Sequence, residues 1–384
     1  MTRNRISVSH RARRRLALTA LASVAAIAGI AAGPALQAAA AENEYHQTNL
    51  VSNLPGRAAT QDTDLRNPWG IVAGPTTPFW VSDNNAGVST LYKGDGSKVI
   101  LNNGVISIPH VIVPAPGGGQ GAPTGVVFAR GSGFTLNANG KSGDSFFIFA
   151  TEDGTIAAWS PAVNFASAVI TVDNSTNPTP STGAVYKGLA LASNGGENLL
   201  YAANFRKGTV DVFDTAFAAE NLGKHAFTDR HIPDGYAPFG IAAVPQGILV
   251  SYAKQDAARH DDLAGPGNGF VDLYSPSGKL LHRLIERGEL NSPWGMVMAP
   301  SKGFGKFSGD LLVGNFGDGR INAYSPEREF AGTLRGEDDQ PLVNEGLWGL
   351  SFGNGNAAGP TTTLFFTAGI NREADGLFGS IVAG

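Results

Sequence analysis

A unit built around one glycine recurs six times in the sequence and restricts the folds that this chain can adopt. The units align on Trp69-Gly70, Thr124-Gly125, Lys187-Gly188, Phe239-Gly240, Trp294-Gly295 and Trp348-Gly349. Successive glycines lie 52 to 63 residues apart. Within each unit, three short apolar runs are separated by turn residues, which is typical of antiparallel β-strands. Six repeats of this length predict an all-β fold, a six-bladed β-propeller.

The two ends of the repeated region indicate how such a ring would close. The sixth unit stops after its third strand, and residues 45–51 form a strand-like piece before the first unit. We expect this N-terminal strand to supply the missing outer strand of the last blade, because closure removes unpaired sheet edges. Residues 42–384 would then form one domain. A linear stack of units and a pair of immunoglobulin-like sandwiches are the alternatives.

Residues 1–41 have the pattern of a cleavable export signal peptide. Six arginines stand among the first 15 residues, an apolar run covers residues 16–30, and residues 38–41 are all alanine. The apolar run is shorter than the roughly 20 residues that span a bilayer, which makes an uncleaved anchor the less favoured alternative. We expect a secreted, extracellular protein, exported by the Sec or the twin-arginine route, with no membrane span after cleavage.

Composition excludes several kinds of site and partner. The chain has no cysteine, which rules out disulfides, thiolate metal sites and cysteine nucleophiles. The formal net charge is −4 and the basic residues are scattered, so we expect no nucleic-acid partner. We expect a monomer whose partner is an extracellular small molecule, a polysaccharide or a protein.

The residues that precede the six glycines are the first candidates for ligand contact. The first strand of a propeller blade lines the channel, so these residues should ring one mouth of it. Four of the six are aromatic, which suits a flat ligand, a sugar ring or an apolar peptide side chain. The predicted ligand-binding residues are Trp69, Lys187, Phe239, Trp294 and Trp348, with Lys254 at the end of a second strand. The sixth position of this ring is Thr124 in the second unit. The alternative is that the aromatic residues only pack blade against blade.

The fourth unit carries a long insertion, residues 254–268, which contains the densest group of reactive side chains. His260, Asp261 and Asp262 are adjacent there, and they are the candidate catalytic residues. A histidine beside two carboxylates could form a metal site, a general acid–base pair or a lid. The alternative is a solvated polar loop, because the spacing matches no established set of metal ligands.

Several motifs are long and specific enough to compare with known families: Tyr252-Ala253-Lys254-Gln255-Asp256, His260-Asp261-Asp262, Leu347-Trp348-Gly349-Leu350, and the run from Leu311 to Gly319. They resemble an uncharacterised family of secreted bacterial propellers in the NHL-like and TolB-like six-bladed superfamily. The resemblance covers about residues 45–384. It implies the fold and export, but no activity.

Oxygen-bearing side chains at the ends of the second strands form a second possible ring. The candidate metal ligands are Asp83, Glu152, Asn204, Asn315 and Asn371. Oxygens that converge from several blades could hold Ca²⁺. Gluconolactonase-like propellers use a central ion of this kind for lactone hydrolysis, but their carboxylates do not match these positions motif by motif. The alternative is that each side chain caps its own turn.

Two functions from different classes follow from these patterns. The first is a binding or scaffold module that recognises its partner on the channel-mouth face. The second is a calcium-assisted hydrolase of the lactonase type. We favour the binding module, because no set of residues in the sequence specifies a reaction and a propeller fold alone does not select a function.

Overall fold

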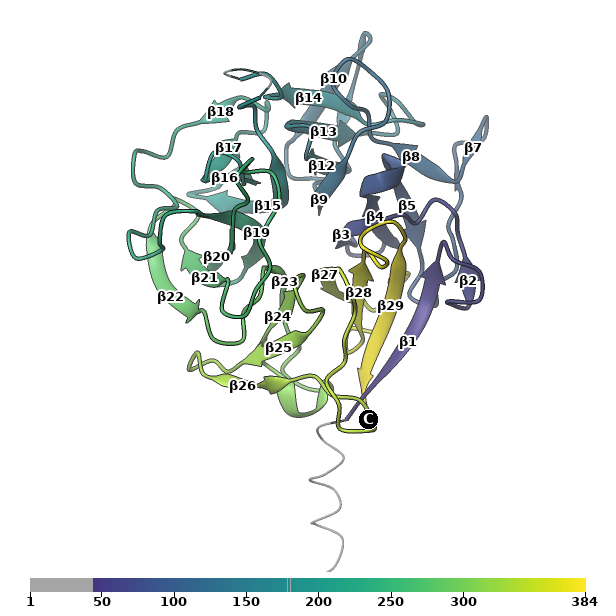
Figure 1. Ribbon diagram of the computed structural model, residues 1–384. Coiled ribbons are helices and arrows are strands. Elements are labelled where there is room, and N and C mark those ends of the chain that lie inside the picture. Colours follow the sequence, from purple (N-terminus) through teal and green to yellow (C-terminus); the bar gives the residue numbers. More distant parts are fainter. Residues whose placement is uncertain (1–43, 178, 180) are drawn as a thin grey trace, which may run out of the picture.

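The chain folds into a ring of six β-sheets around a central channel (Figure 1). The computed structural model describes residues 44–177, 179 and 181–384; the predicted export signal, residues 1–41, lies outside them. Each blade is a sheet whose first strand lies at the channel and whose later strands follow outwards. This is the all-β six-bladed propeller that the repeat predicts. No helix in the described part of the chain is long and apolar enough to cross a membrane.

The blades use the strands of each repeat in chain order. The first blade consists of β3 (Pro68–Val72), β4 (Phe79–Asp83), β5 (Val88–Tyr92) and β8 (His110–Ile112). The second consists of β9 (Pro123–Phe128), β12 (Phe147–Thr151), β13 (Thr155–Trp159) and β14 (Val169–Asp173). The third consists of β15 (Tyr186–Asn194), β16 (Glu197–Asn204), β17 (Thr209–Phe213) and β18 (Ala219–Glu220). The fourth blade consists of β19 (Tyr236–Val244), β20 (Gly247–Lys254), β21 (Phe270–Tyr274) and β22 (Leu280–Glu286). The fifth consists of β23 (Pro293–Met298), β24 (Leu311–Asn315), β25 (Ile321–Tyr324) and β26 (Phe330–Thr333). The sixth consists of β27 (Leu347–Phe352), β28 (Leu364–Ala368) and β29 (Leu377–Ala383), and is completed by β1 (Tyr45–Ser52) and β2 (Thr60–Gln61).

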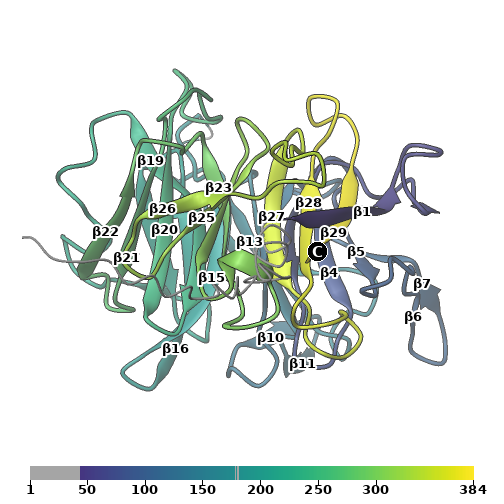
Figure 2. The ribbon, with the colours of Figure 1, turned by 90° about the horizontal axis from the view of Figure 1, so that it is seen from below.

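Short elements interrupt this plan on the periphery. They are the hairpins β6 (Leu101–Asn102) with β7 (Ser107–Ile108) and β10 (Thr135–Ala138) with β11 (Lys141–Asp144), and the 3-10 helices η1 (Asn84–Ala86) and η2 (Gly305–Phe307). Because the inner strands run roughly along the ring axis, their connections gather on two opposite faces (Figure 2). The face where first strands begin and second strands end is called the channel-mouth face below.

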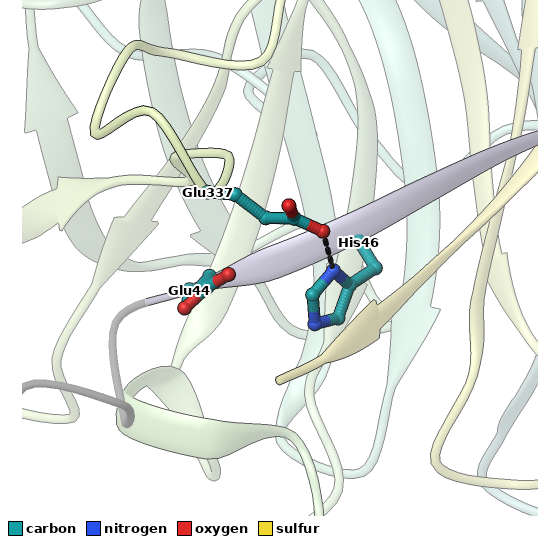
Figure 3. A group of neighbouring side chains, drawn as sticks. All are labelled: Glu44, His46 and Glu337. Atoms are coloured by element: carbon teal, nitrogen blue, oxygen red, sulfur yellow. Dashed lines mark hydrogen bonds and ion pairs between the residues drawn. The ribbon is translucent and has the colours of Figure 1, made fainter.

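The N-terminal strand closes the ring, as the sequence predicts. β1 pairs antiparallel with β29, from Tyr45 opposite Ala383 to Ser52 opposite Leu377. At this seam the Tyr45 hydroxyl donates a hydrogen bond of 3.1 Å to the Phe304 carbonyl oxygen. Beside it, Glu44, His46 and Glu337 gather on the surface (Figure 3), with 2.6 Å between the His46 Nδ1 and a Glu337 oxygen. The first described strand is thus tied both to the last blade and to the fifth.

The repeated glycine is explained by how closely neighbouring first strands approach each other. A Cβ atom on Gly70 would lie 2.5 Å from the Thr124 carbonyl oxygen, and one on Gly349 would lie 2.6 Å from the Trp69 carbonyl oxygen. The second contact joins the last blade to the first. Each glycine therefore lets the backbone of the next blade come close to the channel axis.

Apolar clusters fill the contacts between successive blades. Six clusters each combine residues of two neighbouring blades, and a seventh, made largely of aromatic rings, lies at the centre. On the other side of the central cluster, the residues that follow the repeated glycines line a channel cavity of about 290 Å³. The core is thus shared between blades, and the central cluster lies between this cavity and the channel-mouth face.

Candidate binding site on the channel-mouth face

The ring of residues before the repeated glycines lies around the channel, but it is closed. All six are buried, with exposed fractions of 9% or less: Trp69, Thr124, Lys187, Phe239, Trp294 and Trp348. The Trp69 and Trp348 rings stack with centroids 3.5 Å apart, and Trp294 packs edge-on against both. The open aromatic surface expected from the sequence is therefore corrected to a packed aromatic layer. A ligand contact by these rings stays a prediction, and it would require the layer to open.

Two further rings complete this layer, and neither was among the predicted residues. Phe205 packs on Phe239 with centroids 5.3 Å apart, and Phe316 stacks on Trp348 at 4.1 Å. Each follows an asparagine at the end of a second strand, Asn204 or Asn315, so the repeated Asn-Phe pair was the available signal. Thr124 instead bridges two blades, because its hydroxyl donates to the Tyr186 carbonyl oxygen at 2.8 Å. These contacts leave Lys187 as the one charged member of the ring.

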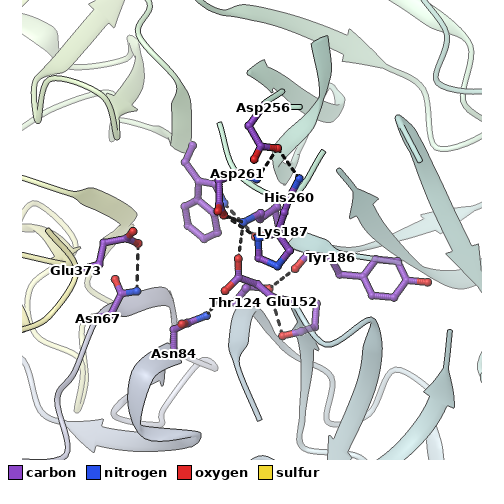
Figure 4. Close-up of polar contacts among 12 residues, drawn as sticks. Asn67, Asn84, Thr124, Glu152, Tyr186, Lys187, Asp256, His260, Asp261 and Glu373 are labelled. Carbon is purple, nitrogen blue, oxygen red and sulfur yellow. Dashed lines mark hydrogen bonds and ion pairs between the residues drawn. The ribbon is translucent and has the colours of Figure 1, made fainter. Parts of the chain in front are cut away.

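Lys187 is a buried ammonium at the centre of the candidate site (Figure 4). Its side chain is 2% exposed, and its Nζ lies 5.1 Å from the centroid of the Trp69 ring. It pairs with a Glu152 oxygen and, at 3.2 Å, with an Asp261 oxygen. Burial by itself would lower the pKa of Lys187, but the charges of these two carboxylates outweigh it and raise the pKa above its usual value. The amine is therefore held in its charged form.

The insertion of the fourth blade, residues 254–268, places its polar groups over Lys187. The Nδ1 of His260 lies 2.9 Å from an Asp261 oxygen, and this hydrogen bond, followed by the charge of Lys187, lowers the pKa of Asp261. The backbone N–H groups of His260 and Asp261 donate to one Asp256 oxygen, at 2.8 and 3.3 Å. The loop thus has internal order, and Asp261 presents a charged side chain that is 67% exposed.

The other two predicted residues of this insertion form no ion pair with Lys187. Asp262 is largely buried, one of its oxygens has no hydrogen-bond partner among the described residues, and burial raises the pKa of its carboxyl group. Lys254 is exposed. The candidate catalytic set is therefore divided: the structure joins His260 and Asp261 to Glu152 and Lys187, but not Asp262.

Most of the predicted calcium ligands bond to other groups of the protein. Asp83 accepts two hydrogen bonds from Thr90, at 3.0 and 2.8 Å, and Asn371 donates to Asp375 at 2.8 Å. Asn204 donates to Asp211 and accepts from backbone N–H groups, while Asn315 donates to the Glu289 carbonyl oxygen. Each of these four side chains thus has a partner outside the predicted ring, which favours the turn-capping alternative, although one buried oxygen of Asp83 and one of Asn315 have no partner among the described residues. Glu152 instead pairs with Lys187, so a calcium ion held by the five residues stays a prediction that these contacts do not support.

Other polar groups join the cluster from the first and last blades. Asn84 donates to the second oxygen of Glu152 at 2.9 Å, and Asn67 donates to Glu373 at 3.1 Å (Figure 4). Burial raises the pKa of Glu373 to about 7, with a further contribution from the charge of Glu152. The sequence analysis missed Glu373, since the turn that brings it inward contains three successive residues with positive φ, which no short motif indicates. The candidate site thus collects side chains from five of the six blades.

The raised pKa of Glu373 predicts a pH-dependent contribution to stability. In the folded state the protonated form is favoured, so this contribution is present at low pH and is lost as the pH rises through about 7. Glu373→Gln keeps an acceptor for Asn67 and removes the charge. We expect the variant to match the parent near pH 4 and to exceed its unfolding free energy at pH 8 by up to about 3 kcal/mol. Denaturant unfolding at both pH values measures this.

The matched control is Glu329→Gln, which removes the same charge from an exposed position between β25 and β26. We expect this variant to follow the parent at both pH values. If the Glu373 variant also tracked the parent at pH 8, the buried carboxyl group would not be the source of the effect.

Two groups of side chains in the described part of the chain could offer metal ligands. Glu152, His260 and Asp261 each place one ligand atom within 4.8 Å of the others, and Glu44, His46 and Glu337 at the seam do the same. In the first group, however, the ammonium of Lys187 already forms ion pairs with both carboxylates. A cation there would have to compete with a buried positive charge, which costs free energy.

Comparison with other proteins finds relatives among viral proteins, and no family model matches the chain. The chain is 32% identical over 342 residues to the uncharacterized protein L690 of Acanthamoeba polyphaga mimivirus, covering 87% of this chain and 84% of that one. This chain belongs to the same family as L690. A second member, R648 of the same virus, is 30% identical and is covered over 78% of its length. Because these members are viral, they do not support the bacterial or secreted origin that the resemblance implies.

Solved structures confirm the fold of the L690 family. Virginiamycin B lyase from Staphylococcus aureus superposes with a TM-score of 0.50 at 13% identity, covering 88% of this chain and 99% of the lyase. A glucose dehydrogenase gives a TM-score of 0.53 at 14% identity, with coverage of 88% and 99%. At such low identity the likeness shows the six-bladed propeller and nothing about the reaction.

Proposed function

We propose that the protein is an exported binding module that recognises an extracellular, hydroxyl-rich ligand, such as a polysaccharide, on its channel-mouth face. The observation that carries this proposal is the buried Lys187, which holds Glu152 and Asp261 in place where several blades meet. Such a charge-assisted network fixes acceptor oxygens before a ligand arrives, and fixed acceptors lower the entropy lost on binding. The pattern of residues 1–41 supports export.

The chemistry of the cluster suits recognition better than covalent catalysis. Its raised pKa keeps Lys187 as an ammonium at neutral pH, and an ammonium has no free electron pair with which to attack a substrate. The exposed carboxylate of Asp261 accepts hydrogen bonds, and the partly exposed imidazole of His260 can donate or accept one. Sugar hydroxyl groups supply matching donors and acceptors.

A calcium-assisted hydrolase remains the less favoured alternative. The names of the lyase and the glucose dehydrogenase show that this fold can carry enzymes. The residues of this chain do not fit a central calcium ion, because four of the five predicted ligands are engaged elsewhere and an ammonium lies at the remaining one. We therefore derive no hydrolytic step through a metal.

Screening the purified protein on an array of immobilised glycans tests the proposal. We expect saturable binding to at least one class of glycan at pH 7. Asp261→Asn removes an exposed charged acceptor without emptying a buried volume, and it should weaken that binding about tenfold or more, as loss of one charged hydrogen bond does.

Asp339→Asn is the matched control, since its carboxylate is 88% exposed on a connecting loop of the fifth blade. We expect this variant to bind like the parent. Absence of glycan binding, or an Asp261 variant that binds as tightly as the parent, would contradict the proposal. Binding that disappears with EDTA and returns with Ca²⁺ would favour the metal-dependent alternative.

A further inference from the structure

A groove lined by basic residues lies beside the central cluster, and neither the ion pair nor the aromatic layer uses it. It has a volume of about 560 Å³ and is lined by Arg206, Lys207 and Arg259, with Ser181 and Thr182 at one side. These residues come from three connections that are distant in sequence: the one before β15, the turn between β16 and β17, and the insertion of the fourth blade. We infer that this basic groove binds an oxyanion, the phosphate or sulfate group of a ligand.

The charge of the groove is unusual for this protein. The whole chain has a net charge of −4, yet the described residues that line this cavity include three cations and no carboxylate. Among the described residues, none of the three cations takes part in an ion pair. Cations brought together without counter-charges repel one another, and a bound anion would relieve that repulsion.

An acidic side chain close to Arg259 in the sequence, Asp256, bonds to backbone groups instead of to the groove cations. Asp256 precedes the lining residues of the insertion, but one of its oxygens accepts the backbone N–H groups of His260 and Asp261. Its backbone carbonyl oxygen accepts a hydrogen bond of 3.1 Å from the Arg259 N–H group. Asp256 thus shapes the turn that carries Arg259, whose φ is 53°, instead of pairing with a groove cation in an ion bridge.

The groove also offers the hydrogen-bond donors that an oxyanion needs. One terminal nitrogen of Arg206 donates to the Gly183 carbonyl oxygen at 3.3 Å, and its Nε is buried with no partner among the described residues. A guanidinium with unused donors matches the oxygens of a phosphate or sulfate group. The hydroxyl groups of Ser181 and Thr182 lie at 3.2 and 2.6 Å from the Thr179 hydroxyl, and each can turn its proton toward a new acceptor.

The inference stands on residues other than those of the proposed glycan site. The fourth-blade insertion nevertheless belongs to both: residues 257–259 line the basic groove, while His260 and Asp261 face Lys187. A ligand that carries both hydroxyl groups and a charged ester would be able to use both sides of this loop. The proposal concerns the charged group alone and does not depend on the glycan.

Isothermal titration of the purified protein tests this inference, with glucose 6-phosphate, inorganic phosphate, inorganic sulfate and glucose as probes. We expect the three anions to bind, glucose not to bind, and the affinity for the anions to fall between 50 and 500 mM NaCl, which are about three-fold below and about three-fold above physiological ionic strength. Tighter binding of the ester than of inorganic phosphate would identify a phosphorylated ligand. Equal binding would identify the free ion as the ligand.

The triple variant Arg206→Gln/Lys207→Gln/Arg259→Gln should weaken anion binding by about tenfold or more, because each lost charged hydrogen bond is worth that factor. Lys141→Gln/Lys279→Gln/Lys302→Gln removes the same net charge from exposed positions outside the groove and should leave binding unchanged. Equal weakening in both triple variants would show a general charge effect and overturn the inference. So would a parent protein that binds none of the three anions.

Discussion

Replacing Gly349 by alanine is expected to lower the free energy of unfolding by about 3 kcal/mol or more, as severe overpacking does. The new Cβ would lie 2.6 Å from the Trp69 carbonyl oxygen and 2.7 Å from a methyl carbon of Ile71. It would also lie 2.8 Å from the Thr367 hydroxyl, which bridges the Gly349 N–H group and the Trp69 carbonyl oxygen. The backbone oxygen cannot rotate away, so the sixth blade must move from the first. Denaturant unfolding measures the loss.

Gly336→Ala is the matched control for this substitution. A Cβ at that position would meet only the ends of two side chains, Leu342 at 3.3 Å and Asp338 at 3.4 Å, which can shift. We expect a change within about 1 kcal/mol. If the two alanine variants lost the same stability, the close approach of first strands would not be the reason for the repeated glycine.

The repeat predicted the fold well because each unit contains the same pattern of apolar runs and turn residues. The period, the turn residues and the truncated sixth unit were sufficient to predict six blades and a closing strand, which β1 and β29 confirm. The reason for the glycine was not available in the same way. It depends on how near the carbonyl oxygen of one blade comes to the backbone of another, and a sequence contains no such distance.

The aromatic residues were predicted at the right place and with the wrong exposure. Spacing indicates that Trp69, Trp294 and Trp348 reach the same mouth of the channel, but it does not give the space available there. Bulky rings that converge on one axis must fill it, and Phe205 and Phe316 leave less room still. The packing alternative thus prevailed over the open surface for a steric reason.

The roles of the polar side chains at the ends of the second strands were also only partly predictable from the sequence. Asp83, Asn204, Asn315 and Asn371 stand where a metal ligand or a turn cap would stand, and sequence position does not distinguish the two. In the folded chain each of the four has another hydrogen-bond partner, such as Thr90 for Asp83 and Asp375 for Asn371, and this favours the capping alternative. The sequence predicted the members of the central ion pair but not their contact. Lys187, Glu152 and Asp261 were each candidate site residues, but only the folded structure shows that the fourth-blade insertion brings Asp261 to Lys187.

Lys187→Met is expected to lower the free energy of unfolding by about 3 to 5 kcal/mol, the usual cost of breaking a buried ion pair from one side. Methionine fills a similar volume beside Trp69, so the loss would come from charge and not from a cavity. Glu152 would keep its hydrogen bond from Asn84 but lose its counter-charge in a site where its side chain is 14% exposed. Denaturant unfolding of the variant at pH 7 measures the effect.

A double-mutant cycle shows whether that loss belongs to the pair. In Lys187→Met/Glu152→Gln no charge is left without a partner at this pair, so we expect the double variant to be less destabilised than the sum of the single variants, by about 1 to 3 kcal/mol. The cycle with Asp261→Asn should give a coupling below about 1 kcal/mol, since the Asp261 carboxylate is 67% exposed and water screens it. Additive losses at Lys187 and Glu152 would mean that the buried ammonium does not hold the carboxylate, and the preorganised acceptors on which the proposed function depends would lose their support.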